Sequence, residues 1–216
     1  MIVSPNKKFV FVHNPKTAGT SIEQVLEPYS NYYNRSVLEI LRFRLNKYGI
    51  LKNWKYMHYH KHLRADEALE FISRESWNSM FTFGFVRNPF DRQVSIYLYK
   101  KRTNTVMSHD LIAKLKDFKA YVHALVNEPE LQRNRYVYQK NYFTDNNNNQ
   151  IVNFVGKYEN LSKDIDKISK AIGIKIDLPW ELKSNRMHYR EYYDEETRKI
   201  MEEYVKPDLD AYDYDF

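Results

Sequence analysis

A short polar segment, His13–Ser21 (HNPKTAGTS), follows an apolar run and precedes a helical pattern. A helix N-terminus presents unpaired N–H groups and a partial positive charge, so it binds anions. Lys16 adds a full positive charge, and Gly19 lets the backbone approach a ligand closely. Hydroxyl donors are also present, at Thr17, Thr20 and Ser21. The segment therefore predicts a site for a phosphate or phosphosulfate group, and the alternative is a plain strand-to-helix turn with an incidental lysine.

A second segment, Val86–Ser95 (VRNPFDRQVS), places another cation after an apolar run. The planar guanidinium of Arg87 matches phosphate oxygens, and Ser95, in the helix expected next, could reach the same anion. Together the two segments would suit a ligand with two separated phosphate groups. The alternative for Arg87 is a salt bridge with Asp91 or another carboxylate, whereas Arg92 is the better candidate for a structural or surface arginine.

Strands and helices are expected to alternate along the chain. Apolar runs predict strands at Lys8–Val12, Met80–Val86 and Ile151–Val155. The first two runs are apolar enough to be buried on both faces, as in parallel sheets. This order predicts an α/β fold with a mainly parallel sheet, in which ligands bind beyond the carboxyl ends of the strands. Both polar segments lie at that position.

Helices are predicted from apolar spacing, capping residues and helix breakers. Their expected positions are Thr20–Leu26, a segment from Ser36 to Gly49, a helix capped by Asp66, a helix after Asp91, Asp110–Asn127, Ser162–Ile172 with Gly173 as its cap, and Asp194–Val205 before Pro207.

The two polar segments resemble those of the PAPS-dependent sulfotransferases, in particular carbohydrate sulfotransferases such as the heparan sulfate 2-O enzymes. PAPS is 3′-phosphoadenosine-5′-phosphosulfate. HNPKTAGTS is similar to the family's 5′-phosphosulfate loop, and FGFVRNPFDRQVSIY is similar to its 3′-phosphate segment. The resemblance continues through KYENLSKDI and through the last segment, which is similar to the ending of bacterial members. It implies a single domain over residues 1–216 with a P-loop-like three-layer α/β/α fold.

The resemblance also implies roles for individual residues. Lys16 would touch the oxygen that bridges phosphate and sulfate, and Arg87 and Ser95 would bind the 3′-phosphate. The 5′ side of the nucleotide would be held by Thr17, Ala18, Gly19, Thr20 and Ser21. PAPS would be the sulfuryl donor, PAP the product and a hydroxyl group, of a carbohydrate or glycolipid, the acceptor, with no metal.

Three alternating histidines, His58, His60 and His62, are candidates for the catalytic base. A neutral imidazole suits general base catalysis near pH 7. In related enzymes a histidine of an H-x-H pair before a helix is the base, so His62 matches best and His60 would support it. Three histidines on one extended face could instead ligate a metal, but family members need none. Ordinary surface histidines are a further alternative, and Glu23 or Glu67 could be the base, because other sulfotransferase families use a glutamate.

Composition excludes several classes of site. The chain has 216 residues and no cysteine, which rules out disulfides, thiolate metal ligands and a cysteine nucleophile, and fits a cytoplasmic protein. No apolar run approaches the ~18 residues of a spanning helix, and no signal peptide is evident, so we expect a soluble protein without a membrane span.

Two other functions compete with sulfuryl transfer. An ATP-dependent P-loop-type kinase is the second interpretation, but the lysine precedes the glycine, unlike in the G-x-x-x-x-G-K-[ST] loop. A nucleic-acid-binding module would fit the net charge of +6, yet no recognised motif supports it, so no nucleic acid is expected as a partner. The patterns specify neither the oligomeric state nor the acceptor.

Three further segments could contribute to the site. Tyr158 and Glu159 could line an adenosine pocket, or serve as a core residue and a helix cap. The tyrosines of Tyr29–Tyr33 could stack on sugar rings or cover the core. A flap over the nucleotide, or an ordinary surface loop, is expected around Asn185, Arg186 and Arg190.

Overall fold

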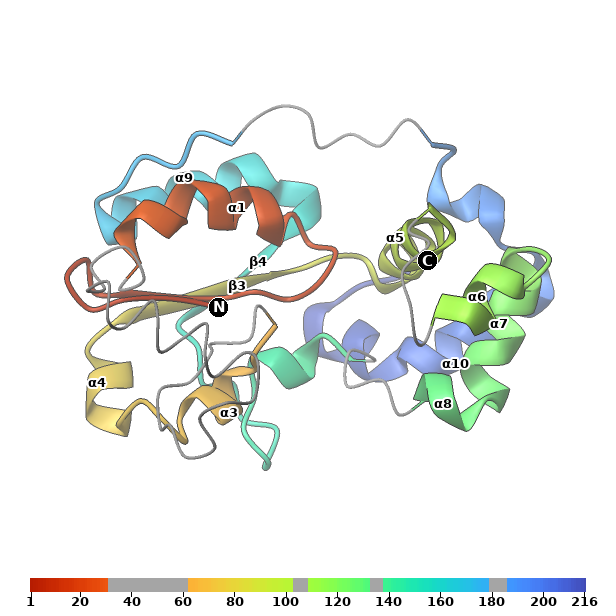
Figure 1. The fold of residues 1–216 in the computed structure, drawn as a ribbon, viewed down its shortest axis with the longest axis horizontal. Helices are drawn as coiled ribbons and strands as arrows, with labels where there is room; N and C mark the ends of the chain where they lie inside the picture. The colour runs from red at the N-terminus through yellow and green to blue at the C-terminus, as the bar shows by residue number, and fades with distance from the viewer. Residues whose placement is uncertain (31–61, 103–108, 133–137, 179–185) are drawn as a thin grey trace, which may run out of the picture. The chain divides into compact units, whose positions relative to one another are not determined.

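The computed structural model describes residues 1–30, 62–102, 109–132, 138–178 and 186–216 (Figure 1). The chain divides into two compact units. The first unit comprises Met1–Phe85 and Asn141–Pro179, and the second comprises Val86–Lys140 and Trp180–Phe216. Each unit has its own cluster of buried apolar side chains. The single domain expected over residues 1–216 stays a prediction.

The first unit is built on a four-stranded sheet with the order β1-β2-β3-β4. The strands are β1 (Ile2–Ser4), β2 (Phe9–Val12), β3 (Phe81–Val86) and β4 (Phe154–Lys157). β2 runs antiparallel to β1, with Phe11 opposite Ile2, and parallel to β3, with Phe9 opposite Phe81. The central strands β2 and β3 are almost completely buried, as their continuous apolar runs predict.

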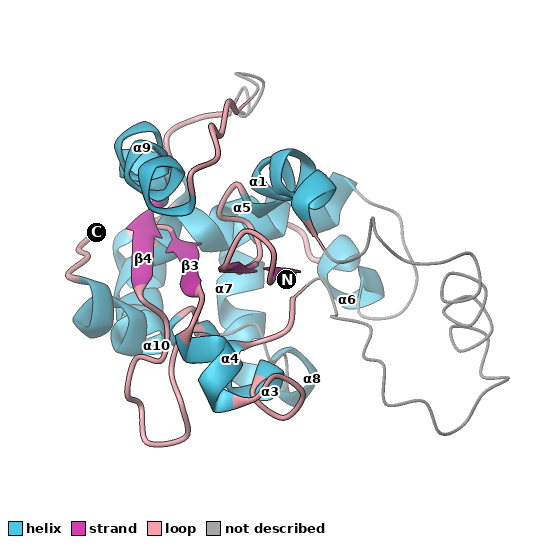
Figure 2. Cartoon of the chain, turned by 90° about the vertical axis from the view of Figure 1, so that its left-hand side faces the viewer, coloured by secondary structure: helices cyan, strands magenta, loops and turns pink. Residues whose placement is uncertain are grey.

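Helices cover both faces of this sheet (Figures 1 and 2). On one face lie α1 (Gly19–Leu26) and α9 (Leu161–Ile172), and on the other lie α3 (Ala65–Ala68) and α4 (Arg74–Asn78). The core between the sheet and the first pair contains Phe9, Phe11, Phe83 and Phe85 from the strands and Ile22, Leu26, Ile165, Ile168 and Ile172 from the helices. The predicted three-layer α/β fold is confirmed.

The second unit is helical. It contains α5 (Pro89–Arg102), α6 (His109–Lys114), α7 (Phe118–Asn127), α8 (Pro129–Gln132) and α10 (Glu195–Tyr212). Its core is formed mainly by α5, α7 and α10, through Phe90, Val94, Tyr121, Val122, Met201 and Val205. The described residues also form short 3-10 helices, which are η1 (Glu27–Tyr29), η2 (Lys140–Tyr142), η3 (Tyr158–Asn160) and η5 (Tyr189–Tyr192).

The helices predicted over Thr20–Leu26 and Ser162–Ile172 are confirmed to within a residue. Gly173 ends α9 in the left-handed conformation, with φ 65°, as expected of a C-terminal glycine. β4, however, begins at Phe154 rather than Ile151. The carbonyl of Ile151 accepts a hydrogen bond from the indole N–H of Trp77 at 2.8 Å, and the N–H of Ile151 donates to Phe143 O. Both main-chain groups of Ile151 are therefore bonded outside the four-stranded sheet.

Two predicted helix boundaries in the second unit are wrong. Asp110–Asn127 is not one helix, because the carboxylate of Asp117 accepts the N–H of Ala120 at 2.9 Å and starts α7 anew. The last helix does not stop before Pro207 but continues through it to Tyr212. Proline costs a helix one N–H bond, and here burial of Val205 and Asp208 on either side keeps the helix packed.

One predicted cap and one predicted turn also differ. Asp66 does not cap α3, because Arg64 precedes the helix and its N–H donates to the Glu67 carboxylate at 3.0 Å. The turn predicted at Arg87–Asp91 is shorter, since α5 already begins at Pro89, where the missing N–H costs nothing.

Several predicted features lie outside the described residues: the helix from Ser36 to Gly49, His58, His60, residues 31–33 and Asn185. Among the helices of the described ranges, none is long and apolar enough to cross a membrane.

Candidate functional site

The loop after β2 is fastened by two buried side chains. The amide of Asn14, which is fully buried, donates to Phe85 O at the end of β3 at 3.0 Å. The hydroxyl of Thr17 donates to Asn14 O at 2.8 Å and closes the loop on itself. Thr17 was predicted to hold the 5′ side of a nucleotide. In this structure its hydroxyl donates its hydrogen bond to the main chain of the loop instead.

The loop backbone adopts an unusual conformation just before α1. Lys16 and Ala18 have φ values of 68° and 64°, in the left-handed region. Each such residue costs about 1–2 kcal/mol relative to the right-handed region. Left-handed residues beside a helix start occur in backbone nests that bind anions through successive N–H groups, and strain of this kind gathers at functional sites. No acidic residue lies in the first turn of α1 to oppose an anion.

Gly19, the first residue of α1, is in close contact with the side chain of His13. A Cβ added at this position would lie 2.1 Å from the Cδ2 and Nε2 atoms of the His13 ring. Any other residue would therefore clash with this ring. Gly19 was predicted to let a ligand approach the backbone. In the structure its missing side chain leaves space for the ring of His13.

The structure brings His62 to this loop. Its Nδ1 lies 3.1 Å from His13 O, and the two imidazole rings meet edge to face with centroids 4.5 Å apart. His13 itself is 2% exposed, and its Nδ1 lies 3.0 Å from the Glu23 carboxylate. The predicted base and the predicted 5′-phosphosulfate loop are thus neighbours within the first unit.

Both glutamates considered as alternative bases have structural contacts. Glu23, on α1, lies against His13, and Glu67 accepts the N–H of Arg64 at the start of α3. Tyr158 and Glu159 lie in η3, directly after β4. Tyr29 is 39% exposed, so it covers little of the core.

In the second unit, the side chain of Gln139, which was not predicted from the sequence, holds the backbone of Arg87. The amide of Gln139 accepts the N–H of Arg87 at 2.9 Å and donates to its carbonyl at 2.7 Å. Gln139 is fully buried, and its own N–H donates to the carboxylate of Asp208 at 2.8 Å. Asp208 also accepts the N–H of Lys140 at 2.9 Å. These contacts fix the main chain at the start of the predicted 3′-phosphate segment.

The Asp208 carboxylate lies in a buried environment. Burial raises the pKa of this carboxyl above its ordinary value, although the N–H groups of Gln139 and Lys140 and the positive charge of Arg92 act in the opposite direction. Arg92 is 1% exposed. It is therefore a buried structural arginine, one of the two roles expected for it.

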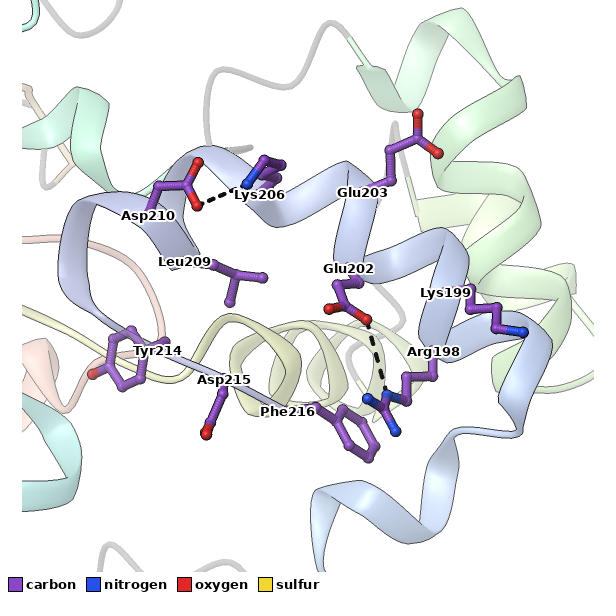
Figure 3. A pocket seen from close by; sticks show the side chains of 10 residues that line it. All are labelled: Arg198, Lys199, Glu202, Glu203, Lys206, Leu209, Asp210, Tyr214, Asp215 and Phe216. Carbon is purple, nitrogen blue, oxygen red and sulfur yellow. Dashed lines mark hydrogen bonds and ion pairs between the residues drawn. The ribbon is translucent and has the colours of Figure 1, made fainter.

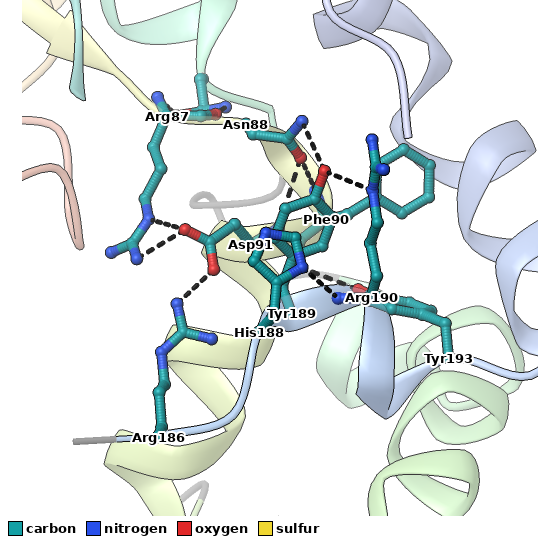
Figure 4. Close-up of polar contacts among 10 residues, drawn as sticks. Arg87, Asn88, Phe90, Asp91, Arg186, His188, Tyr189, Arg190 and Tyr193 are labelled. Carbon is teal, nitrogen blue, oxygen red and sulfur yellow. Dashed lines mark hydrogen bonds and ion pairs between the residues drawn. The ribbon is translucent and has the colours of Figure 1, made fainter. Parts of the chain in front are cut away.

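The guanidinium of Arg87 forms the salt bridge that was the alternative to a phosphate contact. Its Nε and Nη2 lie 2.7 and 2.6 Å from the Asp91 carboxylate (Figure 4). The other oxygen of Asp91 accepts from Arg186, so one carboxylate holds two guanidinium groups. The three side chains retain a net charge of +1, which favours an anion. Ser95 is half-buried on α5.

The segment expected to form a flap is partly described. Besides the contact of Arg186, Arg190 donates to Phe216 O at 2.5 Å. The side chain of Phe216 packs edge to face against Phe90, with ring centroids 4.9 Å apart, and the nearby Asn88 amide donates to Asp215 O.

A surface pocket in the second unit contains none of the predicted site residues (Figure 3). It is lined by one side of α10 and the residues after it, with Lys199, Lys206, Leu209 and Phe216 among them. Within the described parts of the chain, no group of three or more His, Cys, Asp or Glu side chains could hold a metal ion.

The predicted site residues are thus shared between the units. The first unit carries the loop with Lys16 and the base candidate His62, and the second carries Arg87 and Ser95. His13, Gln139 and Asp208 were missed as supporting residues. For Gln139 and Asp208 no local pattern could have indicated them, since their contacts join residues 52 and 69 positions apart.

Three comparisons relate the chain to known proteins. A protein of Archaeoglobus fulgidus, described only as uncharacterized, is 30% identical over 109 residues, which are 50% of this chain and 79% of that protein. The crystal structure of mouse sulfotransferase SULT7A1 complexed with PAP matches with a TM-score of 0.46 and 13% identity, over 99% of this chain and 87% of the mouse chain. The Sulfotransferase family matches residues 1–215, nearly the entire sequence. The chain therefore belongs to the sulfotransferase family.

Proposed function

We propose that this protein transfers the sulfuryl group of PAPS to a hydroxyl group of a carbohydrate or glycolipid. The observation that carries the proposal is the contact of His62 with the loop that contains Lys16. A base candidate, a cation and a helix N-terminus lie together in one unit, and the chain belongs to a family of sulfotransferases.

The loop after β2 would bind the 5′-phosphosulfate end of PAPS. Lys16 would neutralise the charge that develops on the bridging oxygen as the bond from sulfur to that oxygen breaks. The residues from Thr17 to Ser21 would contribute N–H groups at the start of α1, together with the Thr20 and Ser21 hydroxyls. As in phosphoryl transfer, most of the catalysis would come from positioning and charge stabilisation.

His62 would act as the general base. A hydrogen bond from Nδ1–H to His13 O leaves Nε2 as the ring nitrogen that carries a lone pair in the neutral imidazole. That nitrogen would take the proton of the acceptor hydroxyl as its oxygen bonds to sulfur. The role of His60 as a supporting neighbour remains part of the proposal, although this residue lies outside the described part of the chain.

Arg87 and Ser95 would bind the 3′-phosphate of the nucleotide. Because Asp91 already neutralises one of two guanidinium charges, an incoming phosphate would compete with this carboxylate for Arg87. A phosphate carries more negative charge than a carboxylate and offers oxygens for the same planar fork, so the exchange is favourable.

Ligand binding tests the donor. Calorimetric titration with PAP should give saturable binding, whereas ATP–magnesium and an oligonucleotide should raise the melting temperature less than PAP does. Preferential binding of ATP–magnesium would instead support the kinase interpretation. Screening sulfur-labelled PAPS against carbohydrates, lipids, small phenols and peptides then identifies the acceptor.

Three substitutions test the roles. Arg87→Ala should weaken PAP binding about 10–100-fold, the loss expected for a hydrogen bond to a charged group. Lys16→Ala should lower turnover strongly, and His62→Ala should lower it about 10²–10⁴-fold while PAP affinity stays near normal. Exposed residues of the same types, Lys7 and Arg102, provide matched alanine controls. Unchanged PAP affinity in Arg87→Ala, or unchanged turnover in His62→Ala, contradicts the corresponding assignment.

A further inference from the structure

His13 is a buried histidine for which neither a metal nor a substrate contact has been assigned. It directly follows β2, and its ring packs on Phe11 with centroids 5.7 Å apart and an interplanar angle of 25°. A side chain that can carry a charge is rarely placed at 2% exposure without hydrogen bonds that compensate for its burial. Its position beside the base candidate His62 suggests what this residue does.

Three independent contacts fix the His13 ring. Glu23 Oε1 lies 3.0 Å from its Nδ1, at ion-pair distance but outside hydrogen-bond geometry, so this carboxylate limits the movement of the ring on that side. On the other side the ring occupies the space that a Cβ of Gly19 would fill. Phe11 supports one of its faces. The ring therefore has little freedom to rotate.

The fixed ring in turn touches His62. The two rings meet at an angle of 72°, and the carbonyl of His13 lies 3.1 Å from His62 Nδ1. A carboxylate or carbonyl that accepts a hydrogen bond from one imidazole N–H determines which tautomer the ring adopts and where it points. The main-chain carbonyl of His13 thus sets the tautomer of His62, and the His13 ring packs against the His62 ring and holds its own main chain in place.

We propose that His13, held by Glu23 and Gly19, is a positioning residue that keeps His62 in the Nδ1–H tautomer with Nε2 directed to act as the base. This inference rests on the proposed function, in which His62 takes the proton of the acceptor. It also assigns Glu23 a role in positioning His13 instead of a role as the base.

The tautomer of His62 can be measured directly. Nitrogen NMR of histidine-labelled protein at about pH 8, above the ordinary imidazole pKa of about 6.5, distinguishes protonated from unprotonated ring nitrogens. The His62→Ala spectrum assigns the signals. In the wild type we expect the proton on Nδ1. His13→Ala keeps the main-chain carbonyl, but without the packed ring this carbonyl is no longer held against His62, so we expect a large fraction of the proton on Nε2. PAP release from PAPS should fall about 100-fold, the effect of a misplacement of about 1 Å, while PAP affinity is unchanged.

Glu23 supplies a second pair of variants should His13→Ala not fold. Glu23→Ala should shift the His62 tautomer and lower turnover, whereas Glu23→Gln should restore both, because glutamine keeps a side chain of the same size beside the His13 ring. Ile168→Val, a conservative change in the core of the same unit, is the control for loss of stability and should leave both readouts unchanged.

The outcomes separate the two proposals. A wild-type His62 tautomer in both His13→Ala and Glu23→Ala overturns the positioning role, as does loss of turnover in Glu23→Gln with the tautomer intact. Failure of the wild-type protein to bind PAP overturns the proposed function instead, and the tautomer comparison still decides whether His13 positions His62.

Discussion

Replacement of Gln139 by leucine removes the side chain that holds the backbone of Arg87. Gln139 and leucine have similar volumes, but leucine neither accepts the N–H of Arg87 nor donates to its carbonyl, bonds that are 2.9 and 2.7 Å long. Each buried main-chain group left without a partner costs about 1–3 kcal/mol. Removing a buried amide from an apolar environment offsets part of this loss, so we expect a decrease of about 3 kcal/mol in the free energy of unfolding.

The same substitution should weaken nucleotide binding. When its main chain is no longer fixed, Arg87 must be ordered by the ligand, and the loss of one well-placed charged hydrogen bond corresponds to about 1.5–3 kcal/mol, or roughly 10–100-fold in Kd. Urea unfolding measures the stability, and calorimetric titration with PAP measures the affinity.

Gln93→Leu is the matched control, because Gln93 is also buried in the second unit and its side chain accepts a hydrogen bond from the Tyr121 hydroxyl, 2.9 Å away. It should cost stability and leave PAP affinity unchanged. Equal losses of affinity in both variants, or normal PAP binding in Gln139→Leu, would refute the link from Gln139 to the nucleotide.

Three further predictions follow from the geometry. Asp91→Asn should destabilise the protein by about 3 kcal/mol in urea unfolding, because Arg87 and Arg186 lose the carboxylate between them while only 10–11% of each side chain is exposed; an unchanged midpoint contradicts this. Ala18→Gly should raise stability by about 0.5–1 kcal/mol, because glycine adopts the left-handed conformation at φ 64° without strain; a less stable variant argues against it. Burial raises the pKa of Asp208, so its contribution to stability is fully present below the ordinary value of 3.8 and is lost as pH rises through the folded-state pKa. The difference in unfolding free energy between wild type and Asp208→Asn should therefore fall over that range, and a pH-independent difference would exclude this.

Local signals in the sequence predicted β2 and β3 and the helices α1 and α9, but not β1 or α4. The apolar runs of β2 and β3 and the glycine after α9 act within a few residues, so no tertiary information is needed to interpret them. The same approach failed over Asp110–Asn127, where a continuous apolar pattern concealed the cap at Asp117. A single capping side chain leaves the spacing of apolar residues unchanged, so the spacing does not reveal that a new helix begins there.

The candidate site divides in the same way. Lys16 and Arg87 could be selected because each follows a strand and precedes a helix. The supports of the site could not, since Gln139 contacts Arg87 from 52 positions away and His13 contacts His62 from 49. Such contacts depend on how distant segments meet after folding, and a glutamine or histidine looks the same in a sequence whether or not it makes them.

Gly19 has a structural role in addition to the one that its place in the loop predicts. A glycine in a loop that binds phosphate suggests either a left-handed backbone or a close ligand. The left-handed residues here are instead Lys16 and Ala18, and Gly19 leaves space for the ring of His13. The strain at the two left-handed residues, about 1–2 kcal/mol each, is offset by hydrogen bonds from Asn14 to Phe85 O and from Thr17 to Asn14 O, worth about 1 kcal/mol each, and by burial of the loop. The loop is therefore held in a conformation its own residues disfavour, as expected where backbone N–H groups must be oriented before a ligand arrives.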